Sequence, residues 1–134
     1  MKFPKLYTDG ASRGNPGQAG AGAVLFDTED QILEEKCRYL GEVTNNVAEY
    51  QALLMGLDMV LDQGIKEVAI FLDSELIVKQ IQGEYRVKDK NLKVLFDQAQ
   101  GFLQKFKEYT INHVPRAQNK VADQLANLAI DERF

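Results

Sequence analysis

The chain has 134 residues, 45% of them hydrophobic, which is enough for one domain with a substantial core. A single cysteine, Cys37, excludes an internal disulfide framework and a cysteine-based zinc site, and the formal charge of −4 argues against a general polyanion binder. No apolar run approaches membrane-spanning length, and the N-terminus lacks the apolar centre of a signal peptide. We therefore expect one domain over residues 1–134, monomeric and cytoplasmic.

Apolar periodicity and turn residues divide the chain into strands and helices. Three strands come first, followed by a helix, a strand, two helices, a strand and a final helix. They are expected at residues 6–8, 19–26, 32–40, 46–64, 68–72, 74–82, 92–106, 109–114 and from 118 onward. This order predicts an α/β fold with a five-stranded mixed sheet, three antiparallel strands then two parallel ones, flanked by helices.

Three local patterns add detail to this prediction. The first strand ends at Asp9, and the glycine-rich residues 10–17 favour a turn. Gly20 and Gly22 interrupt an apolar strand, which indicates that another backbone approaches it closely. The run 68–72 shows no alternation, as expected of a central strand that is buried on both faces.

Four carboxylates are predicted to meet at one edge of this sheet. Asp9 and Asp73 follow the first and fourth strands, while Glu49 and Asp123 lie in the first turns of two helices. Right-handed crossovers give both strands the same direction, and both helices then start at the same end of the sheet. In open α/β sheets, ligands bind at this edge.

Each carboxylate alone has an ordinary explanation. Asp9 could be a turn residue, and Glu49 follows Asn46 at the spacing of a capping box. Asp73 could cap the next helix, and Asp123 could be a solvated residue favoured by the helix dipole. Together, however, clustered carboxylates repel one another and raise one another's pKa, so an acidic pocket persists at low cost in free energy only when cations occupy it. Oxygen ligands favour Mg²⁺ or Mn²⁺, and two such ions about 4 Å apart can support phosphodiester hydrolysis.

Four short motifs stand on the predicted elements in a fixed order. They are Tyr7-Thr8-Asp9-Gly10-Ala11 with Gly14-Asn15-Pro16-Gly17, Thr44-Asn45-Asn46-Val47-Ala48-Glu49-Tyr50, Asp73-Ser74-Glu75 and Asn119-Lys120-Val121-Ala122-Asp123-Gln124-Leu125-Ala126. Any one of them could occur by chance, but the four in this order form a highly specific signal. On these motifs the chain resembles type 1 ribonuclease H over nearly its whole length, as a single ribonuclease H domain.

The resemblance implies an endonuclease that cuts the RNA strand of RNA/DNA hybrids and leaves 5′-phosphate ends. It implies two Mg²⁺ ions, with Mn²⁺ as a substitute, held by Asp9, Glu49, Asp73 and Asp123. In the family, the residue at the position of Glu49 also contacts the RNA 2′-hydroxyl, and this contact distinguishes RNA from DNA.

Further substrate contacts follow from the same resemblance. Asn15, Asn45 and Asn46 look like the family's minor-groove contacts, and amides suit this role because they both donate and accept. Thr44 looks like part of the pocket that grips a DNA phosphate.

The chain departs from many relatives between its second and third helices. Those relatives carry a basic protrusion rich in tryptophan and lysine, whereas this chain has only residues 83–90 there and no tryptophan. We expect weaker hybrid binding and lower processivity, with Arg86, Lys88 and Lys90 as a partial substitute.

A second departure concerns the histidine that many members place on a loop before the last helix, where it assists product release. The single histidine, His113, precedes Val114 and Pro115 and is expected to end the last strand. An ungapped count back from Asp123 would instead give it the family position. We expect Arg116 to take the auxiliary role by gripping phosphate, because a guanidinium does not shuttle protons near neutral pH.

Two other functions compete with this reading. A magnesium-dependent α/β phosphatase or receiver-like domain would need a second aspartate soon after Asp9 or a lysine at a strand end, and neither is present. A catalytically weak module that binds hybrids is favoured only by the short basic segment.

Overall fold

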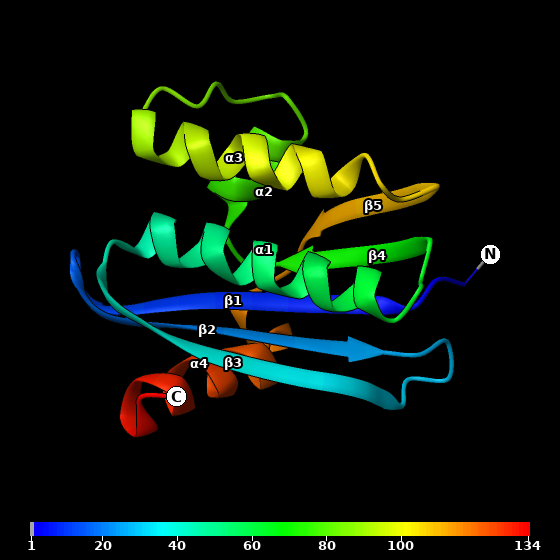
Figure 1. Ribbon diagram of the computed structural model, residues 1–134, viewed down its shortest axis with the longest axis horizontal. Coiled ribbons are helices and arrows are strands. Elements are labelled where there is room, and N and C mark those ends of the chain that lie inside the picture. The colour runs from blue at the N-terminus through cyan, green and yellow to red at the C-terminus, as the bar shows by residue number, and fades with distance from the viewer. Residues whose placement is uncertain (1) are drawn as a thin grey trace.

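A five-stranded mixed sheet forms the middle layer of the molecule (Figure 1), for which a computed structural model describes residues 2–134. The strands are β1 (Lys5–Gly14), β2 (Gly17–Phe26), β3 (Ile32–Val43), β4 (Glu67–Leu72) and β5 (Glu108–His113). Their order is β3-β2-β1-β4-β5, with β1, β2 and β3 antiparallel and β1, β4 and β5 parallel. The predicted α/β architecture is confirmed.

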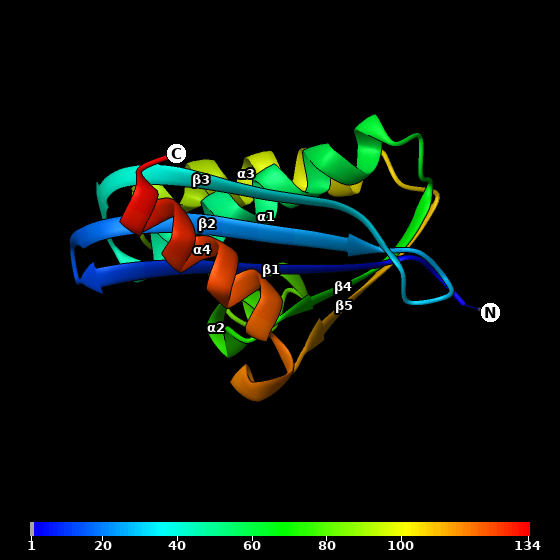
Figure 2. The ribbon, with the colours of Figure 1, turned by 90° about the horizontal axis from the view of Figure 1, so that it is seen from below.

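Helices cover both faces of this sheet (Figure 2). They are α1 (Asn45–Asp62), α2 (Glu75–Ile81), α3 (Lys90–Leu103) and α4 (Lys120–Glu132), the last preceded by a 3-10 turn at Arg116–Gln118. The α1 helix packs on β1 and β2, α3 packs on α1, and α4 lies on the opposite face over β1, β2 and β3. Within residues 2–134, no helix has both the length and the apolar character needed to cross a membrane.

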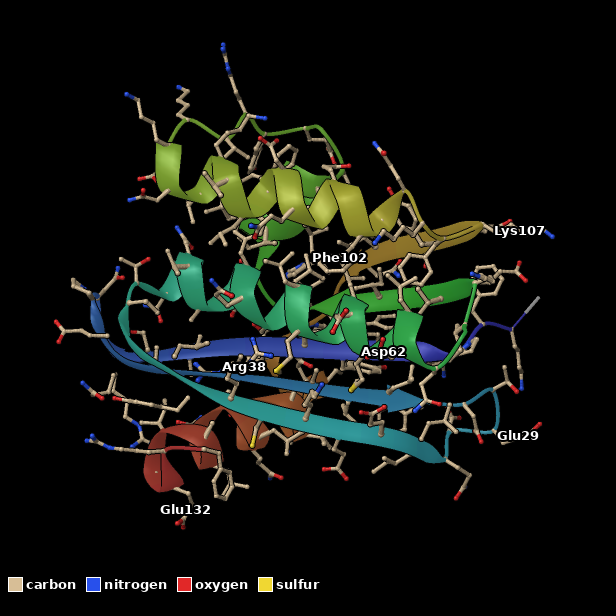
Figure 3. All side chains as sticks on the ribbon, in the orientation of Figure 1. Glu29, Arg38, Asp62, Phe102, Lys107 and Glu132 are labelled. Atoms are coloured by element: carbon tan, nitrogen blue, oxygen red, sulfur yellow. The ribbon has the colours of Figure 1, made fainter. Side chains whose placement is uncertain are left out.

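The main core lies between the sheet and α1. Its largest fully buried side chains include Leu6, Leu25, Tyr50, Leu53, Leu57, Met59, Ile70 and Leu72. Figure 3 shows Phe102 between α3 and α1, whereas Glu29, Lys107 and Glu132 lie at the periphery.

The α1 helix approaches β1 more closely than side chains would allow. A Cβ on Gly10 would overlap the backbone of Ala48 and Glu49, and a Cβ on Gly56 would lie 2.6 Å from Thr8 Cγ2. Gly10 therefore lets the first turns of α1, which carry Glu49, lie against the middle of β1, and Gly56 does the same for a later turn of the helix beside Thr8.

The α4 helix approaches β2 in the same way on the other face. A Cβ on Gly20 would overlap the carbonyl oxygen of Ala126, and one on Gly22 would overlap that of Ala122. The predicted close approach of another backbone is confirmed. It fixes the start of α4, and with it Asp123, above β2.

The prediction that the first strand ends at Asp9 is wrong. β1 continues to Gly14 and pairs with β2 along its whole length, ending with Gly14 opposite Gly17. Pairing with β2 overrides the local turn preference of the glycines, and the turn is confined to residues 15–16. Similarly, the third strand runs past Gly41 to Val43.

The prediction that residues 68–72 are buried on both faces is also wrong. Val68, Ile70 and Leu72 are buried, but Ala69 and Phe71 are only partly so. The cause is the placement of α4, which packs on β1, β2 and β3 and so leaves β4 partly open on the α4 face of the sheet.

Candidate active site

The separation of β1 from β4 brings two carboxylates together. Pairing between these parallel strands ends at Tyr7 opposite Phe71. Asp9 and Asp73 each lie two residues beyond this last pair, at the carboxyl end of β4. Although Asp9 lies within β1, it therefore reaches the same edge of the sheet that the sequence predicts.

The structure excludes helix capping as the role of Glu49 and Asp73. The N-cap of α1 is Thr44, whose side-chain oxygen accepts from the backbone N–H of Val47 (3.2 Å). The N-cap of α2 is Ser74, which accepts from the backbone N–H of Ile77 (3.3 Å). Both carboxylates remain available for other contacts.

Three carboxylates form one tight group. Asp9, Glu49 and Asp73 each offer an oxygen, and these oxygens lie within 4.8 Å of one another. Asp9 is 4% exposed and Glu49 8% exposed. Within the described residues, Glu49 Oε2 is buried without a hydrogen-bond partner, which costs free energy unless a cation or a donor meets it. The residues therefore fit a divalent metal ion that prefers oxygen ligands.

Burial also changes the protonation of this group. Loss of water around Asp9, together with the charge of Asp73, raises the pKa of Asp9 from 3.8 to about 7. Burial and then the charge of Asp9 raise the pKa of Glu49 well above its usual value. A bound cation would favour the ionised forms and offset both effects.

Asp123 reaches the same cavity from α4 but lies outside this tight group. It lines a cavity of about 500 Å³ together with the three other carboxylates. Its side chain is 28% exposed, and Asn127 Nδ2 donates to its Oδ1 (3.3 Å). The structure thus brings all four predicted carboxylates to one cavity, three of them with oxygens within 4.8 Å of one another.

Arg116 and His113 have different positions relative to this cavity. Arg116 lines it, is 82% exposed, and places Nη2 3.9 Å from Asp123 Oδ1. His113 is the last residue of β5, opposite Leu72, as expected of a residue that ends the strand. Of the described residues, Arg116 is the one cation on the cavity wall.

Hydrogen bonds hold in place two of the asparagines that are predicted to contact substrate, Asn15 and Asn45. Asn45 and Asn46 line the cavity, and Asn15 Oδ1 accepts from the backbone N–H of Asn45 (3.1 Å). Asn45 Oδ1 in turn accepts from the backbone N–H of Ser12 (3.2 Å). Both amide oxygens are engaged, so the amide nitrogens of Asn15 and Asn45 are left to donate to a ligand.

Arg86 and Lys88 are not brought to the carboxylates. They line a separate cavity of about 630 Å³ where the loop between α2 and α3 meets α3, together with Tyr85, Lys90 and Lys93. This loop is exposed and carries the local basic group that the sequence predicts.

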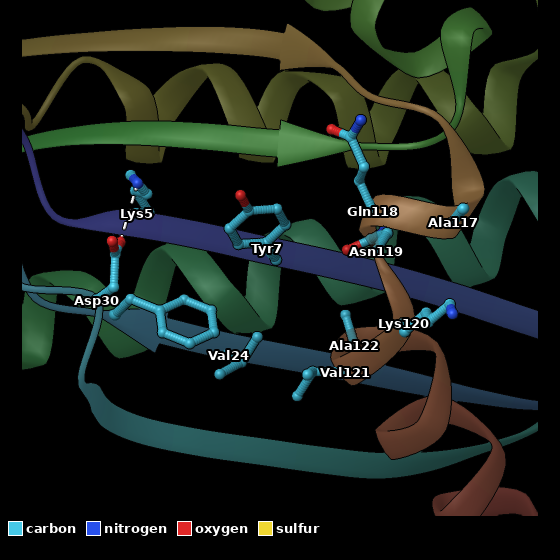
Figure 4. Close-up of a pocket in the computed structure, with 11 residues that line it drawn as sticks. Lys5, Tyr7, Val24, Asp30, Ala117, Gln118, Asn119, Lys120, Val121 and Ala122 are labelled. Carbon is cyan, nitrogen blue, oxygen red and sulfur yellow. Dashed lines mark hydrogen bonds and ion pairs between the residues drawn. The ribbon is translucent and has the colours of Figure 1, made fainter.

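A third cavity lies on the α4 face of the sheet (Figure 4). It has a volume of about 320 Å³, an aromatic floor that includes Tyr7 and Phe26, and an ion pair between Lys5 and Asp30 (2.9 Å) at one side. None of the four carboxylates lines it, so it is not the candidate site.

Comparison with known proteins agrees with the fold and the motifs. Residues 7–129 match a sequence family described as reverse transcriptase-like. The "Bifunctional protein Rv2228c" of Mycobacterium tuberculosis is 45% identical over 94% of this chain, which spans 35% of that protein's length. The crystal structure of RNase H1 from Halobacterium salinarum has a TM-score of 0.94 and 41% identity, covering 97% of this chain and 98% of its own. The chain belongs to the type 1 ribonuclease H family.

Another type 1 ribonuclease H, LC11-RNase H1, was solved in complex with an RNA/DNA hybrid. It has a TM-score of 0.92 and 42% identity, with 97% of this chain and 98% of that one covered. Both structural relatives therefore align along almost the whole of this chain.

Sequence reasoning missed two residues at or beside the cavity of this ribonuclease H. Ser12 lines the cavity, and its hydroxyl donates to the carbonyl oxygen of Val43 (2.8 Å), joining β1 to the end of β3. Asn119 is buried and donates to Asp73 Oδ2 (3.1 Å). The only sequence signal for Asn119 was its place at the start of the motif that contains Asp123.

Proposed function

We propose that this chain is an endoribonuclease that hydrolyses the RNA strand of RNA/DNA hybrids. The observation that carries the proposal is the group of Asp9, Glu49 and Asp73, of which the first two are buried, with oxygens within 4.8 Å of one another. The proposal concerns this domain, because the chain spans 35% of the length of its mycobacterial relative. The hybrid in the LC11-RNase H1 structure supports the choice of substrate.

The reaction adds water to a phosphodiester. A bond forms between the water oxygen and phosphorus, the bond from phosphorus to the 3′ oxygen breaks, and the products are a 5′-phosphate and a 3′-hydroxyl. When bound, two Mg²⁺ or Mn²⁺ ions would supply an activated water and stabilise the leaving oxygen. Asp9, Glu49, Asp73 and Asp123 would hold these ions with oxygen ligands alone.

The other residues of the cavity bind and orient the substrate. Arg116 grips a phosphate and takes no part in proton transfer, because its guanidinium stays charged. Glu49 also accepts from the RNA 2′-hydroxyl, which DNA lacks. Asn15, Asn45 and Asn46 contact the minor groove.

Two further groups act at a distance from the reacting phosphate. Thr44 contributes to binding of the DNA phosphate, and Arg86 and Lys88 extend binding along the duplex. The exposed basic loop supports this second role. We also propose a monomer that acts in the cytoplasm, which light scattering and fractionation of the source cells would test.

The test is cleavage of an end-labelled RNA/DNA hybrid beside matched RNA/RNA and DNA/DNA duplexes, with Mg²⁺, with Mn²⁺ and with chelator. Cuts in the hybrid alone that need metal and leave 5′-phosphate ends are expected. Retained hybrid binding without cleavage would support a binding module instead. Metal-dependent release of phosphate from small phosphomonoesters, without hybrid cleavage, would point to a phosphatase.

A further inference from the structure

Asn119 occupies the N-cap position of α4 but does not cap the helix. Its side chain makes no capping hydrogen bond, although asparagine favours this position because it can accept from the first helical N–H groups. The residue is 1% exposed and lies at the junction of the 3-10 turn and α4, beside β1 (Figure 4). Its side chain therefore serves contacts outside its own helix.

The amide nitrogen of Asn119 joins two elements at the carboxylate group. Nδ2 donates to the carbonyl oxygen of Thr8 (2.9 Å) and to Oδ2 of Asp73 (3.1 Å). Pairing of β1 with β4 ends one residue before Thr8, at Tyr7 opposite Phe71. Nδ2 thus meets the β1 carbonyl where the strands separate, and its two hydrogens serve the two acceptors.

The chemistry of its neighbours fixes the orientation of this amide. Turning it around would place Oδ1 against the Thr8 carbonyl oxygen and the Asp73 carboxylate, with no proton between them. The backbone of Asn119 adds a third contact, since its carbonyl oxygen accepts from the N–H of Asp123 (3.1 Å). One residue therefore contacts β1 next to Asp9, the Asp73 carboxylate and the turn that carries Asp123.

We propose that Asn119 is a positioning residue that holds the Asp73 carboxylate in the orientation in which it faces Asp9 and Glu49. This inference rests on the proposed divalent-metal site. Without this donor, Asp73 would rotate freely and would have to be ordered when the ion binds. Hydrogen-bond partners of metal-binding side chains typically contribute about 10- to 100-fold in metal affinity, so a loss of this size is expected on their removal.

The first test compares Asn119→Ala with Asn112→Ala by calorimetric titration of Mn²⁺, at a temperature well below unfolding of either variant. Asn112 is a matched control because its Nδ2 donates to a β4 carbonyl, that of Ile70 (3.1 Å), and to the Thr110 hydroxyl. Asn119→Ala should bind Mn²⁺ about 10- to 100-fold more weakly and show a lower kcat with an unchanged KM for hybrid. Asn112→Ala should match the wild-type protein.

A double-mutant cycle separates positioning from a general effect on folding. In an Asp73→Ala background, Asn119→Ala should change Mn²⁺ affinity no further. A second loss of the same size there, or an unchanged affinity in the single variant, would overturn the inference. Failure of the wild-type protein to bind Mn²⁺ would overturn the proposed function instead.

A measurement on the wild-type protein covers the case in which Asn119→Ala does not fold. In a Mg²⁺ titration followed by nuclear magnetic resonance, the side-chain amide of Asn119 should shift along the same binding curve as the backbone amide of Asp73. The Asn112 side chain should not shift. An Asn119 amide that stays still while Asp73 shifts would contradict the proposal.

Discussion

Burial of Asp9 among other carboxylates stabilises its protonated form. The unfolded chain titrates Asp near its usual pKa, about 3.9, while the folded metal-free protein holds the pKa of Asp9 at about 7. Between these values the folded state binds more protons than the unfolded state. The free energy of unfolding of the metal-free protein therefore falls as pH rises from about 4 to about 7.

This fall in stability can be measured by urea denaturation in chelator at several pH values across that window. The decrease should be at most about 4 kcal/mol from Asp9, and the raised pKa of Glu49 adds to it in the same direction. Saturating Mg²⁺ should remove most of the decrease, because the ion favours the ionised carboxylates. Stability that rises with pH in chelator would contradict this account.

Substitution of Asp9 by Asn tests the same residue by removing its charge. Asp9→Asn should abolish hybrid cleavage, because a proposed ligand is lost, yet raise the free energy of unfolding of the metal-free protein at about pH 8 by about 1–3 kcal/mol. Thermal unfolding in chelator and the cleavage assay check the two effects. Full activity in this variant would remove Asp9 from the metal site.

At the scale of elements, the position of Glu49 depends on how closely α1 packs on β1. A Cβ on Gly10 would overlap the backbone of Ala48 and Glu49, and neither chain segment can move without displacing the site. Gly10→Ala should lower the free energy of unfolding by about 2–3 kcal/mol or more and reduce cleavage.

A matched control is Gly101→Ala, in α3. Nothing lies within 4 Å of a Cβ at Gly101, so this change should raise the free energy of unfolding by up to about 1 kcal/mol, through helix propensity. Denaturation curves of the two variants are the measurement. A Gly10→Ala variant as stable as Gly101→Ala would contradict the packing argument.

The sequence predicted the order and type of the elements because apolar periodicity depends on which face is buried. It failed where tertiary pairing decides the local structure. The glycine-rich sequence predicted a turn that includes residues 10–14, yet pairing with β2 keeps these residues extended up to Gly14. Asn119 was missed because its role depends on Thr8 and Asp73, which are distant in the chain and meet it only in the folded structure.

The placement of the four carboxylates was predictable for a different reason. Strand direction and crossover handedness decide which end of the sheet each carboxylate reaches, and both follow from the order of the elements. The distances between them were not predictable. They depend on Gly10, which lets Glu49 approach β1, and on the end of β1–β4 pairing at Tyr7.

At the scale of the whole molecule, the net charge of −4 means that duplex binding depends on local basic groups, and we propose that the loop with Arg86 and Lys88 is one of them. The double variant Arg86→Ala, Lys88→Ala should raise KM for hybrids of any sequence and leave kcat unchanged. The negative slope of the log association constant against log salt concentration should become smaller in magnitude by about 1 for each phosphate that the variant no longer neutralises.

Lys107→Ala is the control, since Lys107 lies at the other end of α3 from this loop (Figure 3). Equal effects of Lys107→Ala and the double variant would contradict a specific role for the loop.

The metal site formed by the four carboxylates is tested most directly by a crystal structure with a hybrid and Mn²⁺, in which anomalous scattering locates the metal. We predict two peaks about 4 Å apart, at the scissile phosphate and in contact with carboxylate oxygens of Asp9, Glu49, Asp73 and Asp123. Hybrid bound at the cavity with no peak within coordination distance of any of these four residues, in a protein that cleaves under the same conditions, would contradict it.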